Sequence, residues 1–318
     1  MNIGSHRTSA YLKAAKIMKK HTLLSLVLAL SLTGCSIRKL VVAQTADVFK
    51  GAMPAFEKDW DYDLVELALP GNIKMIEAFL EADPGNQDLL FLSAQAYTAY
   101  ALVFLEDHLE RSEEDTPEYN RYHRRAKEGH LRGHRYGLRL IDTRQHKFSA
   151  AFNKGGEALD AALAKCTKDD APALFWTAMP LAAATSLDRE DISLIASVPK
   201  VKVIIARVAE LDEAYYDAGP HMILGSIYGS LSPALGGDHK KSKGHFERGL
   251  KLTKRRFLLH HVMYAKTLAV QTQDKALFKK LLGEVLKADL SIYPEQNLAN
   301  VAAKRRARRL LKQMDDLF

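Results

Sequence analysis

Apolar residues recur every three or four positions along almost the whole chain after residue 40. One stretch places five large side chains on a single helix face: Val201, Ile204, Ile205, Val208 and Leu211. The segment 277–286 repeats this pattern with a wider stripe. No stretch reads as a convincing strand. The sequence therefore predicts an all-α protein whose amphipathic helices must pack against one another.

Turn and capping sequences separate the apolar stripes. Segment 83–86 (Asp-Pro-Gly-Asn) reads as a turn followed by a helix cap, and segment 169–172 places two acids and a proline at a helix start. Segment 293–295 (Tyr-Pro-Glu) opens the last helix in the same way. The spacing of these signals predicts about twelve helices with short connections.

Internal self-similarity indicates how the helices are arranged. Segment 224–228 (Leu-Gly-Ser-Ile-Tyr) matches the core of a tetratricopeptide first helix, in which glycine permits close approach and tyrosine fills the groove between neighbours. Segment 246–250 echoes the second helix, and segment 94–97 repeats the small-residue and tyrosine arrangement upstream. We predict a tetratricopeptide-like array of helical hairpins, an α-solenoid. An irregular helical bundle is the alternative.

The first 35 residues read as a bacterial export signal. Lys19 and Lys20 precede an apolar run over 23–32, which is too short for a permanent membrane helix. The following segment 32–35 (Leu-Thr-Gly-Cys) resembles a lipobox, in which Cys35 is acylated with fatty acids such as palmitate and becomes the first mature residue. A signal peptide that is cleaved elsewhere is the alternative. Translation can start at Met1 or at Met18, which begins a compact basic region.

This interpretation divides the chain into three parts. They are a lipoprotein signal peptide (1–34), a membrane-proximal tether with the first helix (35–60), and a tetratricopeptide-like helical domain (61–318). Five of the 46 Lys and Arg residues precede residue 35, which leaves 41 bases against 38 acids. The nearly balanced body gives no reason to expect a nucleic-acid partner. Cys166 then lacks a disulfide partner, and Ser36 after the acylated cysteine favours the outer over the inner membrane.

The chain resembles the TatT component family of TRAP transporter systems from about residue 64 to the end. The resemblance is carried by motifs in the right order: Leu69-Pro70, Leu89-Leu90, 96–101, 173–176, 210–212, Leu224-Gly225-x-x-Tyr228, Pro233-x-x-Gly236-Gly237-Asp238, 297–300, Ala307-x-x-Leu310-Leu311 and 316–318. Gly249 and the basic run 251–256 depart from the family pattern.

The resemblance implies a periplasmic accessory lipoprotein rather than an enzyme. Its implied partner is the solute-binding subunit of a TRAP transporter, for which it would be a docking scaffold, and homotrimers are implied as well. Two other functions share the same sequence features: a helical-repeat scaffold for outer-membrane assembly, and a periplasmic ligand carrier or enzyme with an internal cavity.

Catalytic and metal-binding patterns are weak in this chain. His123, His130 and His134 share one helix face and could hold zinc, but seven arginines and lysines in the same stretch disfavour a cation. The alternative is a basic helix that faces solvent or lipid headgroups. The chain has no nucleophile elbow and no phosphate-binding glycine loop. We therefore predict no catalytic residue, no metal and no cofactor.

Candidate residues for binding a partner or ligand come from exposed aromatics and from the glycine-rich loop: Trp176, Tyr215, Tyr216, Gly236, Gly237 and Asp238. Most aromatic residues are expected in the core, including Tyr228, whereas Tyr215 and Tyr216 are expected to form an exposed pair. In the last helix, the basic run 304–312 is interpreted as a solvated face or as a surface for acidic lipid or an acidic partner.

Overall fold

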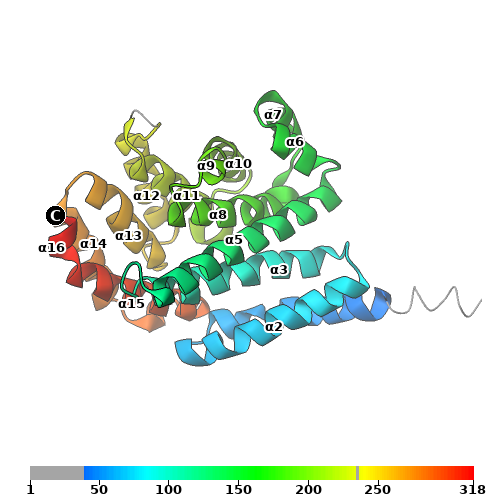
Figure 1. Ribbon diagram of the computed structural model, residues 1–318, viewed down its shortest axis with the longest axis horizontal. Coiled ribbons are helices and arrows are strands. Elements are labelled where there is room, and N and C mark those ends of the chain that lie inside the picture. The colour runs from blue at the N-terminus through cyan, green and yellow to red at the C-terminus, as the bar shows by residue number, and fades with distance from the viewer. Residues whose placement is uncertain (1–38, 234–235) are drawn as a thin grey trace, which may run out of the picture.

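The computed structural model describes residues 39–233 and 236–318 of the chain. The predicted signal peptide, both candidate start sites and Cys35 lie outside these residues. Every regular element in the described part is helical, so the predicted all-α class is confirmed (Figure 1). After a helix over 39–57, the main elements are α2 (Tyr62–Ala82), α3 (Gln87–Ala99), η1 (Tyr100–Leu105), α4 (Glu106–Leu109), α5 (Pro117–Arg144), α6 (Phe148–Lys154), α7 (Gly156–Ala164), α8 (Ala171–Leu187), α9 (Ile192–Ile195), α10 (Val198–Leu211), α11 (Tyr215–Ser230), α12 (His239–Leu252), α13 (Leu259–Tyr264), η4 (Ala265–Ala269), α14 (Lys275–Lys287), α15 (Asn297–Lys312) and α16 (Met314–Leu317).

The predicted boundary segment 83–86 supplies a helix cap, and Asp61 supplies another. The Asp61 side chain accepts a hydrogen bond from the Leu64 amide at the start of α2, and the Asn86 side chain caps α3 in the same way. The helix over 39–57 and α2, together called the N-terminal hairpin, lie along one edge of the molecule (Figure 1). The Phe49 and Phe79 rings pack 5.8 Å apart between these two helices.

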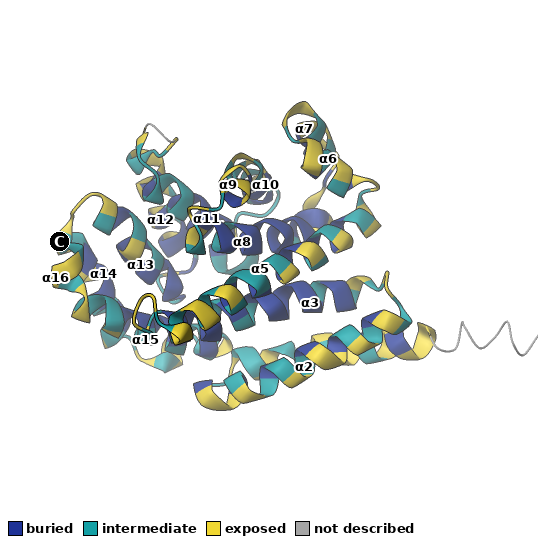
Figure 2. Cartoon of the chain, in the orientation of Figure 1, coloured by how far each residue is buried: buried dark blue, intermediate teal, exposed yellow. Residues whose placement is uncertain are grey.

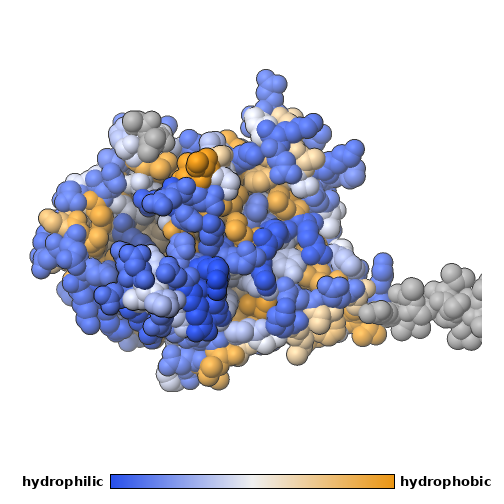
Figure 3. Space-filling model, in the orientation of Figure 1, coloured by the Kyte–Doolittle hydropathy of each residue, from blue (hydrophilic) through white to orange (hydrophobic). Residues whose placement is uncertain are grey.

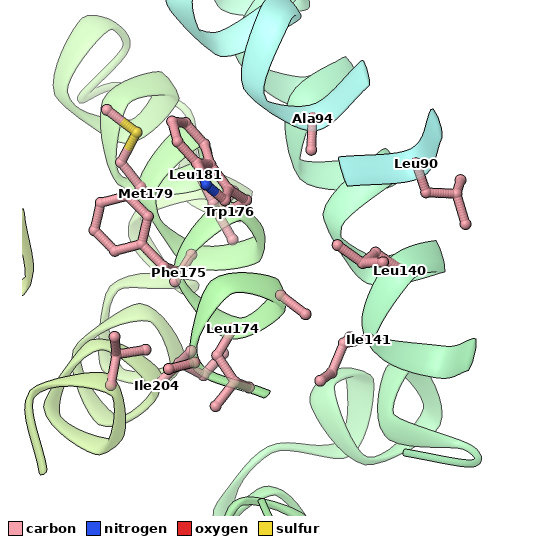
Figure 4. Close-up of a cluster of buried hydrophobic side chains, with 14 of the residues drawn as sticks. Leu90, Ala94, Leu140, Ile141, Leu174, Phe175, Trp176, Met179, Leu181 and Ile204 are labelled. Carbon is pink, nitrogen blue, oxygen red and sulfur yellow. The ribbon is translucent and has the colours of Figure 1, made fainter. Parts of the chain in front are cut away.

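Helices α3, α5 and α8 form the centre of the fold, with α5 packed against both of the others. The residues of α8 are buried on nearly every side of the helix, whereas α2 leaves its outer side exposed (Figure 2). Trp176 and Phe175 of α8 belong to the same apolar cluster as Leu140 of α5 and Ile204 of α10 (Figure 4). A helix that is apolar all round must be enclosed by other helices.

Three glycines on α5 let this helix approach its neighbours closely. A Cβ atom on Gly133 would lie 2.4 Å from the Thr98 hydroxyl of α3, and a Cβ atom on Gly137 would lie 2.5 Å from the Trp176 carbonyl oxygen of α8. Gly129 meets the Cβ of Ala101 in the same way. The spacing of four residues keeps all three on one face.

The predicted hairpin over 224–250 is formed by α11 and α12. Gly225 lies against the Phe246 ring, because an added Cβ would be only 3.0 Å from that ring. The Tyr228 ring stacks on the His245 ring of α12, with the two ring centroids 5.8 Å apart. The Lys202 amino group of α10 lies 5.5 Å from the centroid of the Tyr228 ring. Glycine and tyrosine therefore have the packing roles that the repeat pattern predicts.

The continuous helix Gln87–Leu109 is long and apolar enough to cross a membrane by length and composition alone. It joins α3, the π-helical η1 and α4, and 72% of its most apolar window is buried inside the fold. This burial identifies it as the core helix around which the other layers assemble.

Candidate functional site

The three histidines of α5 share one face, where His130 and His134 are buried and His123 is half-buried, and each one bonds a different neighbour. The His130 ring donates from Nε2 to the Glu106 carboxylate at 2.8 Å, and His134 donates from Nδ1 to the Thr177 carbonyl at 2.7 Å. His123 donates from Nε2 to the Leu187 carbonyl at 3.1 Å. No group of three possible ligands in the described residues could hold a metal ion. The shared face is as predicted, but the histidines point into the protein rather than to solvent or lipid.

A second buried cluster joins α15 to α4 and the residue that follows it. Arg306 donates to the Glu106 carboxylate at 2.8 Å, and Arg305 donates to Asp107 at 3.0 Å. Arg309 spans Asp107 and Glu110, at 2.5 Å and 2.6 Å. The interpretation of the basic run as a solvated or partner-facing surface is wrong for these three arginines. Their acidic partner is this chain itself, about 200 residues upstream.

The arginines keep the acids of this cluster ionised. Burial alone raises the pKa of Glu106, but Arg306 and the hydrogen bond from His130 outweigh it and lower that pKa. Burial is likewise outweighed at Glu110, mainly by Arg306 and Lys266, and its pKa is also lowered. The side chains of Glu106 and Arg306 are each more than nine-tenths buried, so this is an internal ion pair.

Trp176, Tyr215 and Tyr216 form one aromatic cluster that is mostly internal. Trp176 is 1% exposed and donates its indole N–H to the Tyr215 hydroxyl at 3.0 Å. The Tyr216 and Trp176 rings meet edge to face at 4.8 Å, and burial raises the pKa of Tyr216. Tyr215 and Tyr216 are half-buried, so they are not the exposed pair expected from the sequence.

A left-handed turn begins α11 directly beside this cluster. Tyr216, Asp217 and Ala218 have φ values of 46°, 52° and 57°, which cost non-glycine residues about 1–2 kcal/mol each. The turn is held at its centre, because Tyr293 donates its hydroxyl to the Asp217 carboxylate at 2.6 Å and His260 donates to the Asp217 carbonyl at 2.7 Å. Backbone strain of this kind concentrates at functional sites.

Two half-buried acids, Glu57 and Asp217, lie around the left-handed turn. Burial raises the pKa of Glu57, and the charge of Asp217 raises it further. Burial also raises the pKa of Asp217 itself, against the opposing hydrogen bond from Tyr293. Nothing in the local sequence signals the turn except the Gly219-Pro220 pair, at which the regular helix begins.

The loop residues Gly236, Gly237 and Asp238 shape the connection between α11 and α12. Gly236 has a φ of 87°, and a Cβ on Gly237 would lie 1.9 Å from the Leu231 carbonyl oxygen. The Asp238 carboxylate accepts from the Lys241 amide at 2.9 Å and so caps α12. This loop follows the far end of α11, roughly 20 Å along the helix from Tyr215. The six candidate residues therefore fall into two separate regions.

Two hollows open among the helices, and one of the six candidate residues lines the second. The first, of about 160 Å³, has a mainly apolar surface formed by α8, α10, α11 and α13, with several serine and threonine residues, Arg189 and the buried Arg306 also in its walls. The second, of about 330 Å³, lies between the helix over 39–57, α3, α5 and α8. Charged residues surround the second hollow, and Tyr215 lies in its wall. The structure therefore offers one apolar cavity and one cleft that combines apolar surface with four charged residues, called the polar cleft below.

Comparison with known proteins identifies the family. The family described as the TRAP transporter T-component matches residues 58–318, which is most of the chain. The chain belongs to this family. An uncharacterized protein of Treponema pallidum (strain Nichols) is 26% identical over 301 residues, which cover 90% of this chain and 93% of that relative. The resemblance found in the sequence is confirmed, and membership makes this T-component chain part of a TRAP transport system in the bacterial envelope.

The sequence contains two signals for the features that were not anticipated. Glu106, Asp107 and Glu110 have the same spacing, one and then three residues, as Arg305, Arg306 and Arg309. Two helices with matched charges at matched spacing can pair along one seam. The glycines at 129, 133 and 137 similarly mark a helix face made for close packing. The left-handed turn at Tyr216–Ala218 has no comparable signal.

Proposed function

We propose that this T-component is a lipid-anchored periplasmic scaffold onto which the solute-binding subunit of its TRAP transporter docks. Family membership over residues 58–318 is the observation that carries the proposal. The anchor is the acylated Cys35, placed in the outer rather than the inner membrane after removal of residues 1–34. Segment 35–60 forms the tether and first helix, and segment 61–318 forms the docking body, which we expect to assemble as a homotrimer.

The internal ion pairs support a scaffold role. They connect α15 to α4 and the residue that follows it across about 200 residues of chain, and so fix the C-terminal helices to the central layer. A preorganised body loses little conformational entropy when another protein binds it. The polar cleft beside Tyr215 is the docking region we favour. Trp176 and Tyr216 pack against Tyr215 and hold it in the cleft wall. The loop over 236–238 is a second, separate contact.

Co-purification tests the docking. A C-terminally tagged chain is captured from detergent-solubilised membranes of its own organism, and the solute-binding subunit of a TRAP transporter is expected with it. Charge reversal at the cleft, Lys50→Glu or Asp169→Lys, is expected to reduce the captured amount, whereas Lys243→Glu on exposed α12 leaves it unchanged. Capture of outer-membrane assembly proteins instead would support the alternative scaffold function.

The anchor is tested separately by mass spectrometry of the N-terminal peptide from the native protein. Cleavage before Cys35 with two or three acyl chains is expected, since one chain alone binds membranes only weakly. An unmodified Cys35 thiol would contradict the anchor.

The apolar cavity supports a second candidate function, that of a ligand carrier. Its walls hold the buried Arg306 rather than a buried acid or histidine, and its size suits a small apolar group. Native mass spectrometry of the gently purified protein tests this function: a bound small molecule supports it, and Met222→Trp, which fills the cavity, should release that molecule.

A further inference from the structure

The N-terminal hairpin, counted with the turn that joins its two helices, carries most of the large hydrophobic residues that the described structure leaves exposed. Seven of the eleven large hydrophobic residues exposed in the described structure belong to it: Leu40, Val41, Val48, Trp60, Leu64, Leu67 and Met75. Figure 3 shows apolar atoms along the lower edge of the molecule, where α2 lies in Figure 1. The remaining four residues are divided between α9, α10 and the segment before α15.

Helix α2 is apolar on two opposite faces. Its inner face buries Val65, Leu69, Ile73, Ile76 and Leu80. Its outer face carries a continuous stripe at spacings of three, four, four and three: Leu64, Leu67, Gly71, Met75 and Ala78. Leu67 is 81% exposed, and a Cβ on Gly71 would meet nothing within 4 Å. A helix with a second apolar face is typical of one that contacts another apolar phase.

The position of the anchor indicates which phase this is. Cys35 precedes the helix over 39–57 by only four residues, which span at most about 14 Å when fully extended. Acyl chains on Cys35 would therefore hold Leu40 and Val41, in the first helical turn, close to the bilayer surface. Trp60 lies three residues beyond the opposite end of that helix, whose 19 residues span about 28 Å.

We propose that the outer face of the N-terminal hairpin lies flat on the lipid bilayer that holds the anchor. Amphipathic helices bind membranes in this way, with the apolar face in the headgroup region, and tryptophan is enriched at that depth. The inference rests on the proposed acylation of Cys35. It orients the T-component so that α9 and α12, away from the hairpin in Figure 1, face the periplasm.

The chain contains two tryptophans, which makes the orientation measurable. Trp60 is 69% exposed at the far end of the hairpin, and Trp176 is 1% exposed in the core. The mature acylated protein is reconstituted into vesicles of phosphatidylcholine and phosphatidylglycerol with brominated acyl chains, which quench nearby indoles. We expect loss of the Trp60 emission relative to unbrominated vesicles. Trp60→Phe removes this loss, because only Trp176 remains.

Matched variants distinguish lying flat from being tethered. Leu67→Glu on the hairpin is expected to reduce the quenching of Trp60, whereas Ile192→Glu, equally exposed on α9, is expected to leave it unchanged. A protein that floats with the vesicles while Trp60 stays unquenched overturns the inference and leaves the anchor intact. A protein that does not float overturns the anchor and the inference together. Emission that shifts with protein concentration but not with bromine identifies a second copy on this face and also overturns the inference. Capture of the solute-binding subunit is independent of all these outcomes.

Discussion

Replacing Arg306 with methionine tests the buried ion pair between α15 and α4. Methionine keeps much of the side-chain volume but removes the charge that faces Glu106, which is itself only 7% exposed. Breaking a buried pair by removing one partner typically costs about 3–5 kcal/mol. For a chain of this size, that corresponds to a fall in melting temperature of about 5–8 °C at pH 7.

The pH dependence of this loss is the sharper part of the prediction. In the wild type, the lowered pKa of Glu106 contributes stability that is present above its unfolded pKa and is lost as the pH falls through the folded value. Without Arg306, burial is expected to raise the pKa of Glu106 instead. Glu106 of the variant then takes up a proton below neutral pH, which removes the unpaired buried charge and reduces the loss of stability. The difference in melting temperature should therefore narrow between pH 7 and pH 5, as followed by circular dichroism.

The double variant Arg306→Met with Glu106→Gln is the control. It removes both charges, so it should recover much of the loss, although His130 then bonds an amide instead of a carboxylate. A double variant as unstable as the single one, or a temperature difference that is constant with pH, would refute the ion-pair reasoning.

Three further predictions concern the central layer and the buried titratable groups. Gly137→Ala places a Cβ 2.5 Å from the Trp176 carbonyl and should lower stability by roughly 1–3 kcal/mol, whereas Gly244→Ala on open α12 should raise it by up to about 1 kcal/mol, both measured by urea unfolding. Burial lowers the pKa of His260 to about 4, so about 2 kcal/mol of stability should be lost as the pH falls from 7.5 to 5, and His260→Gln should flatten that dependence in thermal melts. Burial raises the pKa of Cys166 to about 11, so this thiol should react with a disulfide reagent only after denaturation; rapid reaction of the native protein would contradict its burial.

Local patterns predicted the elements of this fold well. The cap at Asn86, the glycine at 225 and the tyrosine at 228 depend on contacts that a helix makes with itself or with its hairpin partner. Such contacts follow the helical period, which is visible in a single sequence. The all-α class and the family followed from these residues.

Long-range partners were beyond the reach of the sequence patterns. The basic run of α15 reads as a solvated face because its acids lie about 200 residues away, next to an apolar helix. The half-buried state of Tyr215 and Tyr216 depends on a left-handed turn that is held by two residues distant in sequence, His260 of α13 and Tyr293 in the connection before α15. Periodicity places a side chain on a face of its own helix, but it does not say what covers that face.

Titration of the purified, acylated T-component with the TRAP solute-binding subunit of the same organism tests the central claim most directly. Isothermal calorimetry should show saturable binding at micromolar or lower concentration, weakened by Asp169→Lys at the polar cleft and unaffected by Lys243→Glu. No binding heat and no complex in sedimentation at tens of micromolar would contradict the account.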